Sequence, residues 1–300
     1  MTDRYAVIGQ PVAHSQSPRI QTLFATQFGA EISYEKIEVA PDALAESLKR
    51  LHAEGYKGLN ITLPHKLEAL KLCEAVSDRA QVAGAVNVVK RTETGWSGDN
   101  VDGAGFIRDL ARLGFVIAGK KVLVLGAGGA TRGILKPLLD QKPSELTLSN
   151  RNPWKPEELA EQFKAYGKIR PCTHIALKGD RFELIVNATS VGHTGAFLKL
   201  PGQLLADGGA CYDMSYGKAF APFAAWVKSQ NTKRVADGIG MLVEQAALSH
   251  QFWRGVMPKT EPVIAALHAG TPASSDNAAT APRKSGSCTE DRNARGDAID

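Results

Sequence analysis

The residues best suited to chemistry are a lysine and several acids that follow short apolar runs. Lys66 ends the segment Asn60-Ile-Thr-Leu-Pro-His-Lys, which leaves a predicted strand and enters a predicted helix. A lysine held near a carboxylate can donate or accept the proton of a secondary alcohol or a ketone during hydride transfer. Most lysines are surface residues without such a role. The position of Lys66 directly after a strand end favours the catalytic interpretation.

Candidate carboxylates are found in Gly98-Asp-Asn-Val-Asp-Gly, which precedes another predicted helix. We expect Asp99 or Asn100 to cap that helix, because Asp and Asn are favoured at the N-cap position. Asp102 then remains for chemistry.

Two serines and an amide add polar groups at other predicted element ends. In His14-Ser-Gln-Ser-Pro, Ser17 with Pro18 is typical of a helix N-cap followed by proline at the first helical position. Ser15 and Ser17 can also bind a carboxylate, because hydroxyls, free amides and the helix dipole all favour an anion. The two roles of Ser17 are compatible. Asn87 is predicted to lie on an apolar strand, where its amide needs a polar partner.

The sharpest local pattern is an apolar run that ends in glycines, Lys121-Val-Leu-Val-Leu-Gly-Ala-Gly-Gly-Ala-Thr131. Glycines allow a tight turn and let the backbone touch a pyrophosphate, and the helix that follows supplies free amides and a partial positive charge. Thr131 stands where a third glycine is usual. We predict a dinucleotide site here. The alternative is a tight strand-to-helix turn without a ligand.

The next predicted strand, 145–149, indicates which dinucleotide fits. An NAD site usually has Asp or Glu at the end of this strand, where it binds the 2′-hydroxyl of the ribose. The chain has Asn150-Arg-Asn152 instead. Arg151 can hydrogen-bond a 2′-phosphate with its planar guanidinium, and Lys155 adds positive charge. We therefore expect NADP(H) as the cofactor, with a solvated turn and a chance arginine as the alternative.

Short apolar runs alternate with amphipathic segments, which predicts an α/β fold with largely parallel sheets. We expect an N-terminal α/β substrate domain (1–102 and 241–270) and a Rossmann-type NADP-binding domain (103–240), with the C-terminal helix returning to the first domain. The tail, 271–300, lacks bulky apolar residues and is predicted to be disordered. The expected strands are 5–8, 34–39, 58–62, 121–125, 145–149, 184–187, 210–214 and 233–236, and helices are expected at 101–113, 241–252 and 262–269.

Composition sets limits on the partners. The net charge of +5 comes from basic residues scattered among 31 acids, so we expect no nucleic-acid partner. No apolar stretch approaches the roughly 20 residues of a membrane helix, and the N-terminus lacks the apolar core of a signal peptide. The four cysteines and seven histidines lack paired spacing, so we expect reduced thiols, no metal and a cytoplasmic location. A monomer or a homodimer is expected.

Taken together, the motifs resemble the shikimate dehydrogenase family from about Tyr5 to Leu267. Several motifs in one order are more specific than any single one. The motifs are Ser15-Gln-Ser-Pro, Asn60-Ile-Thr-Leu-Pro-His-Lys, Ala85-Val-Asn, Gly98-Asp-Asn-Val-Asp-Gly, Gly126-Ala-Gly-Gly-Ala, Asn150-Arg, Asn187-Ala-Thr-Ser-Val-Gly, Asp213-Met-Ser-Tyr and Asp237-Gly-Ile-Gly-Met-Leu-Val-Glu-Gln.

The resemblance implies an oxidoreductase that acts on a CH–OH group, with the NADPH-dependent reduction of 3-dehydroshikimate to shikimate as its reaction in aromatic amino-acid biosynthesis. It implies that Lys66 and Asp102 are the catalytic pair and that Ser15 and Ser17 bind the substrate carboxylate. Contacts to the hydroxyl-bearing ring are implied for Thr62, Asn87, Tyr216 and Gln245. Cofactor contacts are implied for Gly126, Ala127, Gly128, Gly129, Ala130, Asn150, Arg151, Asn152, Lys155, Thr189, Met214, Gly238 and Met241.

Two departures from the family pattern stand out. Asn152 occupies the place of the usual threonine after Asn-Arg, which removes one hydroxyl expected near the 2′-phosphate. The segment after Tyr216 reads Gly-Lys where the family pattern has a proline, so this loop is expected to differ in shape. Two alternative functions are an NAD-dependent quinate/shikimate dehydrogenase and a non-catalytic nucleotide-binding regulator. The presence of both Lys66 and Asp102 argues against the regulator.

Overall fold

The computed structural model describes residues 2–270, and the tail predicted to be disordered lies outside the described residues. Its strands are β1 (Asp3–Gly9), β2 (Ile32–Glu38), β3 (Gly58–Ile61), β4 (Ala75–Val76), β5 (Val88–Arg91), β6 (Trp96–Asp99), β7 (Lys121–Leu125), β8 (Glu145–Asn150), β9 (Ile169–Thr173), β10 (Phe182–Asn187), β11 (Leu205–Asp213) and β12 (Val235–Ala236). Its α-helices are α1 (Ser17–Thr26), α2 (Leu44–Ala53), α3 (Lys66–Leu72), α4 (Asp78–Ala83), α5 (Asp102–Arg112), α6 (Gly129–Asp140), α7 (Trp154–Gln162), α8 (Ala221–Lys228), α9 (Ile239–Arg254) and α10 (Glu261–His268).

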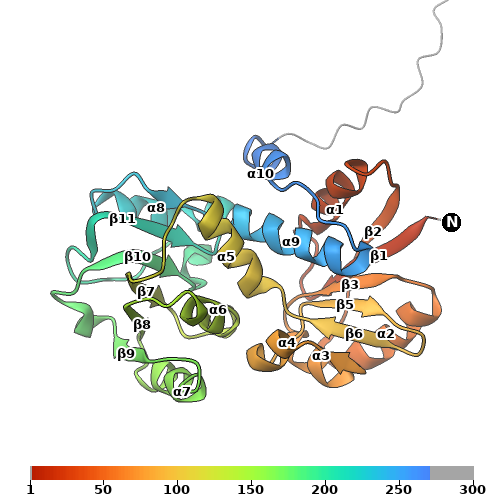
Figure 1. The fold of residues 1–300 in the computed structure, drawn as a ribbon, viewed down its shortest axis with the longest axis horizontal. Helices are drawn as coiled ribbons and strands as arrows, with labels where there is room; N and C mark the ends of the chain where they lie inside the picture. The colour runs from red at the N-terminus through yellow and green to blue at the C-terminus, as the bar shows by residue number, and fades with distance from the viewer. Residues whose placement is uncertain (1, 271–300) are drawn as a thin grey trace, which may run out of the picture. The chain divides into compact units, whose positions relative to one another are not determined.

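The first sheet is mixed and has the strand order β2-β1-β3-β5-β6-β4. β1 pairs parallel to β2 and β3, whereas β5 pairs antiparallel to both β3 and β6. β5 and β6 are joined by the short segment 92–95, and so short a connection permits only antiparallel pairing. The N-terminal strands β1, β2 and β3 are therefore paired in parallel (Figure 1), and Lys66 follows β3 in the chain.

Alternate residues of this sheet face two different cores. Ala6 and Ile8 of β1 pack on the side that α2, α3 and α4 cover. Tyr5 lies on the opposite face beside Trp253 of α9, where Ile20 of α1 also packs against α9. The sheet is thus covered on both faces, which its buried strands require.

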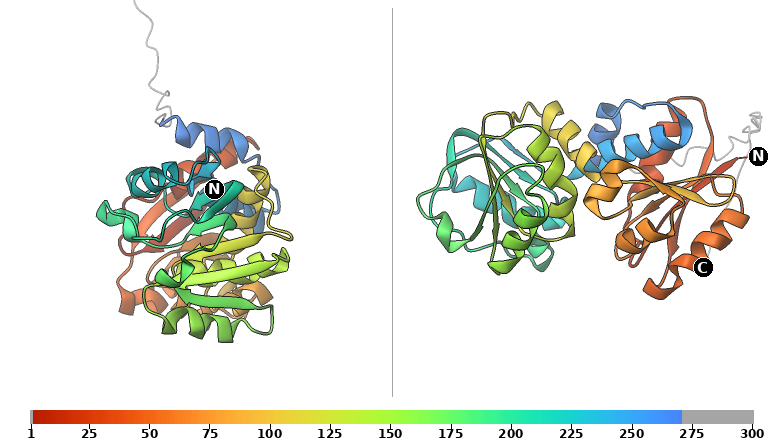
Figure 2. Two further views of the ribbon diagram at one scale, coloured as in Figure 1. Left: turned by 90° about the vertical axis from the view of Figure 1, so that its left-hand side faces the viewer. Right: turned by 60° about the horizontal axis from the view of Figure 1, so that its bottom comes forward.

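The second sheet is entirely parallel and has the order β9-β8-β7-β10-β11-β12. This is the 3-2-1-4-5-6 order of a Rossmann sheet, in which a dinucleotide binds at the carboxyl ends of the strands where the order reverses. That point lies between β7 and β10. Helices α5, α6 and α7 pack on one face and α8 on the other (Figures 1 and 2).

The C-terminal helix α9 returns to the first sheet, as the sequence predicts. Nε2 of Gln21 donates to the carbonyl of Ala246 at 2.8 Å, and Nε1 of Trp253 donates to the carbonyl of Val89 at 2.9 Å. These bonds fix both ends of the contact that α9 makes with the first sheet and α1. Within residues 2–270, no helix is long and apolar enough to cross a membrane.

Candidate active site

Lys66 and Asp102 meet at the first turns of two helices. Lys66 is the first residue of α3, and Asp102 is the first residue of α5. Nζ of Lys66 lies 2.5 Å from Oδ2 of Asp102, and the two side chains are 27% and 22% exposed. Nδ2 of Asn87 donates to the other carboxylate oxygen at 2.8 Å. The carboxylate is therefore fixed by two donors, while the ammonium keeps further hydrogens for a ligand.

Asn87 connects the start of β5 to the start of α5. It lies one residue before β5, so the prediction that it sits on a strand is wrong by one position. Its carbonyl accepts the backbone N–H of Ile61 at 2.8 Å, and its side-chain Oδ1 accepts the N–H of Val101 at 2.9 Å. Since the whole amide is bonded, its Nδ2 is aimed at Asp102 without freedom to turn away.

Of the two residues expected to cap α5, Asp99 or Asn100, Asp99 does not do so. Its buried carboxylate accepts hydrogen bonds from Arg79 and Ser77 instead. Burial alone would raise the pKa of Asp99, but these bonds outweigh burial and hold the pKa below its ordinary value. The N-cap of α5 is Val101, and Oδ1 of Asn100 accepts the N–H of Asp102 at 3.2 Å. Asn100 therefore serves the helix start, and Asp102 stays free for Lys66.

The prediction that Ser17 caps α1 is also wrong. The helix begins at Ser17, and Gln16 occupies the N-cap without a side-chain bond. Pro18 then stands at the second helical position, where its missing N–H costs no helical bond. Ser15 binds the first free amide of the helix, because its Oγ accepts the N–H of Ser17 at 3.2 Å. Its hydroxyl also donates to Oγ of Ser17 at 3.1 Å. Both hydroxyls therefore gather at the start of α1, where an anion is favoured.

A polar chain that sequence reasoning missed extends from Ser17 to α9. The hydroxyl of Tyr34 donates to Oδ1 of Asn60 at 2.7 Å and also hydrogen-bonds Ser17. Nδ2 of Asn60 donates to Oγ of Ser249 at 2.9 Å. Burial raises the pKa of Tyr34, so its hydroxyl remains protonated. Asn60 stood in a noted motif, but nothing in the sequence indicated Tyr34 or Ser249.

The other predicted substrate residues are not joined to this group by side-chain bonds. Within the described part of the chain, no hydrogen bond links Thr62, Gln245 or Tyr216 to Lys66 or Asp102. Nε2 of Gln245 donates to the carbonyl of Leu242 on its own helix. Thr62 donates its N–H to the carbonyl of Ile8. Tyr216 follows β11 and is half-buried, which raises the pKa of its hydroxyl. Their assignment to the substrate stays a prediction.

The glycine turn has the shape that a dinucleotide needs. Gly126 has φ +104°, and a Cβ there would lie 2.9 Å from Cγ2 of Thr189, so only glycine fits. A Cβ added to Gly128 or Gly129 would meet no atom within 4 Å, which means that the backbone borders open space. Helix α6 starts at Gly129 without a side-chain cap. Its first amides are therefore available to a phosphate.

Thr131 explains how the turn manages without the usual third glycine. The residue is fully buried, and its hydroxyl donates to the carbonyl of Gly126 at 2.8 Å. This bond ties the first turn of α6 back to the end of β7. The helix then packs on the sheet through Ile134, Leu135 and Leu138.

The end of β8 and the segment after it carry four polar residues and an unpredicted tryptophan. Oδ1 of Asn150 accepts the N–H of Asn152 at 3.3 Å, which shapes the turn, and Arg151 is exposed. Nζ of Lys155 lies 5.4 Å from the ring centroid of Trp154, which is 56% exposed. No acidic side chain stands among them, so the local charge suits a phosphate.

The last predicted cofactor residues follow β10, β11 and β12. Oδ1 of Asn187 accepts both the N–H and the hydroxyl of Thr189, at 3.2 and 2.7 Å. Gly238 lies so close to Met214 that an added Cβ would be 2.2 Å from its carbonyl oxygen. Met241 is only 9% exposed and packs in the core of the second sheet, so its side chain offers little surface to a ligand.

Comparisons with known proteins give one consistent result. Residues 7–89 match the shikimate dehydrogenase substrate binding domain, residues 109–194 match the shikimate / quinate 5-dehydrogenase family, and residues 238–268 match the shikimate 5′-dehydrogenase C-terminal domain. A protein of Nitrosospira multiformis named shikimate dehydrogenase (NADP(+)) is 44% identical over 268 residues, which cover 89% of this chain and 98% of the relative.

Solved structures with the same fold include two with substantial sequence identity. The Ael1 enzyme from Pseudomonas putida has a TM-score of 0.83 and 41% identity, with 89% of this chain and 98% of that chain covered. Shikimate 5-dehydrogenase from Thermus thermophilus, in complex with NADP(H) and shikimate, has a TM-score of 0.79 and 33% identity, with 90% of this chain and 100% of that chain covered. This chain therefore belongs to the shikimate dehydrogenase family.

Proposed function

We propose that this protein is an NADP-dependent shikimate dehydrogenase, which reduces 3-dehydroshikimate to shikimate with NADPH in a reversible reaction. The observation that carries the proposal is the Lys66–Asp102 pair, 2.5 Å apart and backed by Asn87. A proton donor fixed in this way is what the carbonyl oxygen of the substrate needs as it becomes a hydroxyl. The name shikimate dehydrogenase (NADP(+)), which the Nitrosospira multiformis relative carries, supports the same activity.

The proposed substrate site combines this pair with hydroxyl and amide groups of other segments. Ser15 and Ser17 bind the carboxylate at the start of α1, where two hydroxyls meet a helix N-terminus. Thr62, Asn87, Tyr216 and Gln245 are proposed to contact the hydroxyl-bearing ring. Tyr34 supports Ser17 from the buried side through its own hydroxyl.

Proton transfer is proposed to occur at Nζ of Lys66. In the direction of reduction, the ammonium donates its proton to the substrate oxygen, and in the reverse direction the amine accepts it. Oδ2 of Asp102 holds the ammonium in place, and Asn87 prevents the carboxylate from rotating. Both side chains are partly exposed, so a proton can be exchanged with solvent after each turnover.

The cofactor NADP(H), when bound, supplies or accepts the hydride. Its pyrophosphate is proposed to lie on Gly126–Ala130, where the backbone borders open space and the amides of α6 are free. Asn150, Arg151, Asn152 and Lys155 are proposed to hold the 2′-phosphate. Thr189, Met214, Gly238 and Met241 are proposed to line the rest of the site, with Met241 contributing mainly through its backbone.

We also propose the division of the chain that the sequence predicts. The substrate domain comprises 1–102 and 241–270, and the cofactor domain comprises 103–240. The first sheet falls in the former and the second in the latter, which supports this division.

The proposed assembly is a monomer or a homodimer, because Lys66 and Asp102 come from a single chain. The proposed compartment is the cytoplasm. Cys73, Cys172 and Cys211 are free thiols, which fits a reducing environment.

Initial rates test the proposal directly. The purified protein is assayed with shikimate and with quinate, each with NADP and with NAD. We expect shikimate with NADP to give the highest kcat/KM of the four combinations. The matched family includes both shikimate and quinate dehydrogenases, so this comparison decides between them. Dominant oxidation of quinate with NAD would replace the proposal with its alternative, and no turnover in any combination would favour the regulator.

Arg151→Ala tests the cofactor assignment separately. A guanidinium that hydrogen-bonds a phosphate contributes about 1.5–3 kcal/mol, so the KM for NADP should rise by about tenfold or more. The kcat/KM with NAD should stay within about twofold, because NAD has no 2′-phosphate. Lys168→Ala, at a residue outside the proposed site, serves as the control. An equal loss with both cofactors would show that Arg151 does not select for the phosphate.

A further inference from the structure

Helix α6 crosses helix α5 directly behind Asp102. A Cβ atom added to Gly103 would lie 2.4 Å from the carbonyl oxygen of Gly133 and 2.5 Å from Cγ of Pro137. A Cβ atom added to Gly133 would lie 3.8 Å from Cβ of Asp102. The backbone of α6 therefore rests on α5 at the residue next to Asp102, and only glycine fits at position 103.

Pro137 accounts for the carbonyl group in this contact. In a regular α-helix, the carbonyl of Gly133 would accept the N–H of residue 137, but proline has no N–H. Pro137 lies inside α6, so the carbonyl of Gly133 lacks this partner and instead approaches Gly103. The carbonyl of Gly133, which lacks its helical hydrogen bond from residue 137, thus fits into the space that Gly103 leaves by having no side chain.

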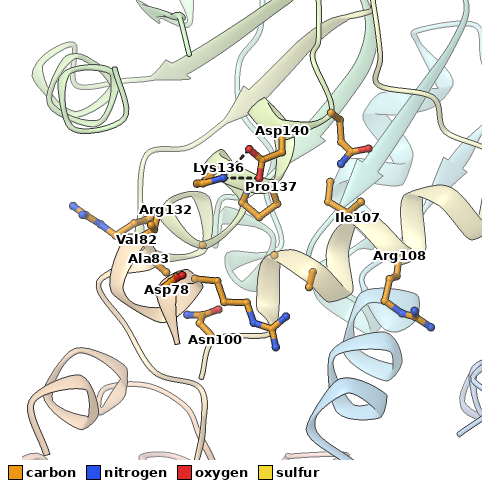
Figure 3. A pocket seen from close by; sticks show the side chains of 15 residues that line it. Asp78, Val82, Ala83, Asn100, Ile107, Arg108, Arg132, Lys136, Pro137 and Asp140 are labelled. Atoms are coloured by element: carbon orange, nitrogen blue, oxygen red, sulfur yellow. Dashed lines mark hydrogen bonds and ion pairs between the residues drawn. The ribbon is translucent and has the colours of Figure 1, made fainter. Parts of the chain in front are cut away.

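A cavity lies next to the contact between Gly103 and α6. Helices α4, α5 and α6 line this cavity of about 510 Å³, and Gly103, Gly133 and Pro137 belong to its wall. Figure 3 shows Pro137 projecting from α6 toward the side of α5 that carries Ile107. None of the residues assigned to the substrate or to the glycine turn lines this cavity. On this flank, the separation of the two helices is therefore set by the glycine–proline contact.

Asp102 thus has supports on two sides. Lys66 and Asn87 bind its carboxylate from the first sheet, and α6 approaches its backbone from behind. Gly133 lies four residues after Gly129, about one helical turn from the end of α6 that is assigned to the cofactor. Any change in the separation of α5 and α6 must therefore move Asp102 relative to the cofactor site.

We propose that Gly103 and Pro137 are positioning residues that set the place of Asp102 relative to the helix that binds the cofactor. The inference rests on the function proposed above. Neither residue touches the substrate. Gly103 acts by letting the α6 backbone approach, and Pro137 acts by directing the carbonyl of Gly133 toward α5.

Gly103→Ala tests this inference. Real Cβ contacts are essentially never below 3.0 Å, so alanine requires a local shift of about 0.6 Å between the two helices. Since a displacement of about 1 Å can cost about a hundredfold in rate, we expect kcat to fall by about ten- to a hundredfold. The KM for shikimate and the Kd for NADPH should stay within about threefold. The pH profile of kcat should also shift, because Lys66 and Asp102 are no longer held at the same distance.

Gly133→Ala is the matched control in the facing helix. The nearest atom to its added Cβ is an ordinary 3.8 Å away, so we expect kcat within about twofold of wild type. A folded Gly103→Ala protein with wild-type kcat and pH profile would overturn the inference. An equal loss of kcat in Gly133→Ala would also overturn the inference, because the loss would then not depend on the contact that Gly103 makes with α6.

A double variant covers the case in which Gly103→Ala does not fold. Pro137→Ala removes the ring from the contact and restores a helical N–H, which favours α6 by about 3 kcal/mol. We expect Gly103→Ala/Pro137→Ala to fold and to have a kcat at least threefold below that of Pro137→Ala alone. Equal kcat values in these two proteins would overturn the inference. A wild-type protein without shikimate turnover would instead contradict the proposed function.

Discussion

The ammonium of Lys66 is held by a carboxylate that is itself held by an amide. Asp102 contacts Nζ at 2.5 Å, and Asn87 donates to the remaining carboxylate oxygen. Ordering a free lysine side chain costs about 1.5–2 kcal/mol of rotamer entropy. This cost is met when the protein folds, so the proton donor is in place before the substrate arrives.

Replacing Lys66 with alanine should remove turnover and leave the fold intact. General acid–base groups contribute about a hundredfold or more to the rate, so kcat should fall by at least that factor. Circular dichroism and NADPH binding, followed by fluorescence, should match the wild type, because Lys66 is partly exposed and the glycine turn is separate from it.

Lys71→Ala provides the control on the same helix. This lysine is 71% exposed and pairs with Glu68 on the helix surface, so kcat should be unchanged. Turnover of Lys66→Ala close to that of Lys71→Ala would remove Lys66 from the mechanism.

Residue types and positions were sufficient to single out Lys66 and Asp102, which the structure brings to 2.5 Å, while their catalytic role stays a prediction. Both follow strand ends, and strand ends of one sheet meet at a common edge. Tyr34 and Ser249 could not be predicted in this way, because one lies in the middle of a strand and the other in the middle of a helix. Their connection through Asn60 depends on the return of α9, across 189 positions of sequence. Asp99, one of the two candidates for capping α5, has a different role because it binds Arg79, which lies 20 positions away in sequence.

Among the elements, buried strands could be predicted best. β7 was predicted with its exact bounds, because five residues with four buried apolar side chains precede a glycine turn. β9 was missed, because it is an edge strand that reads Ile-Arg-Pro-Cys-Thr and pairs only with β8. Edge strands tolerate proline and charge, so they lose the apolar pattern that marks a strand. β4 has only two residues and carries no pattern at all.

Trp253 is the main packing contact between α9 and the first sheet. Its ring lies 4.9 Å from that of Tyr5, and a Cβ added to Gly58 would lie 2.2 Å from its Nε1. Trp253→Ala should lower the free energy of unfolding by about 3–5 kcal/mol, because it leaves a cavity and removes the hydrogen bond that Nε1 donates to the carbonyl of Val89. Urea denaturation followed by circular dichroism measures this loss. Trp154→Ala, at an exposed tryptophan, should change the free energy by less than about 0.5 kcal/mol, and equal effects of the two substitutions would contradict the packing argument.

At the scale of the whole molecule, two buried titratable groups make the stability depend on pH in opposite directions. His250 of α9 is 1% exposed and packs near Phe24 and Phe28. Its Nδ1 lies 3.0 Å from Oε1 of Gln21, which only accepts, so the neutral ring carries its proton there. Burial lowers the pKa of His250 to about 4. Burial has the opposite effect on a carboxyl group, and it raises the pKa of Asp213, at the end of β11, to about 6.

The direction in which each group changes the stability with pH depends on whether the folded or the unfolded state binds its proton more tightly. The unfolded chain binds a proton at His250 below pH about 6.5, and the folded protein does so only below about 4. Stability from this group is therefore lost as the pH falls through that window, by about 3 kcal/mol in total. Asp213 is protonated more readily in the folded protein. Its contribution is therefore lost as the pH rises from about 4 to about 6, again by about 3 kcal/mol.

His250→Gln and Asp213→Asn should separate the two contributions, because each substitution removes one titration and keeps a polar side chain. Between pH 8 and pH 4, His250→Gln should lose less unfolding free energy than the wild type does. The variant has no buried imidazole that resists protonation. Asp213→Asn should be more stable than wild type at pH 8 and should approach it near pH 4, where the native carboxyl is itself neutral. Denaturant titrations of the three proteins at pH 4, 6 and 8 measure both differences. Variant curves parallel to the wild-type curve across this range would mean that neither buried group titrates as the structure requires.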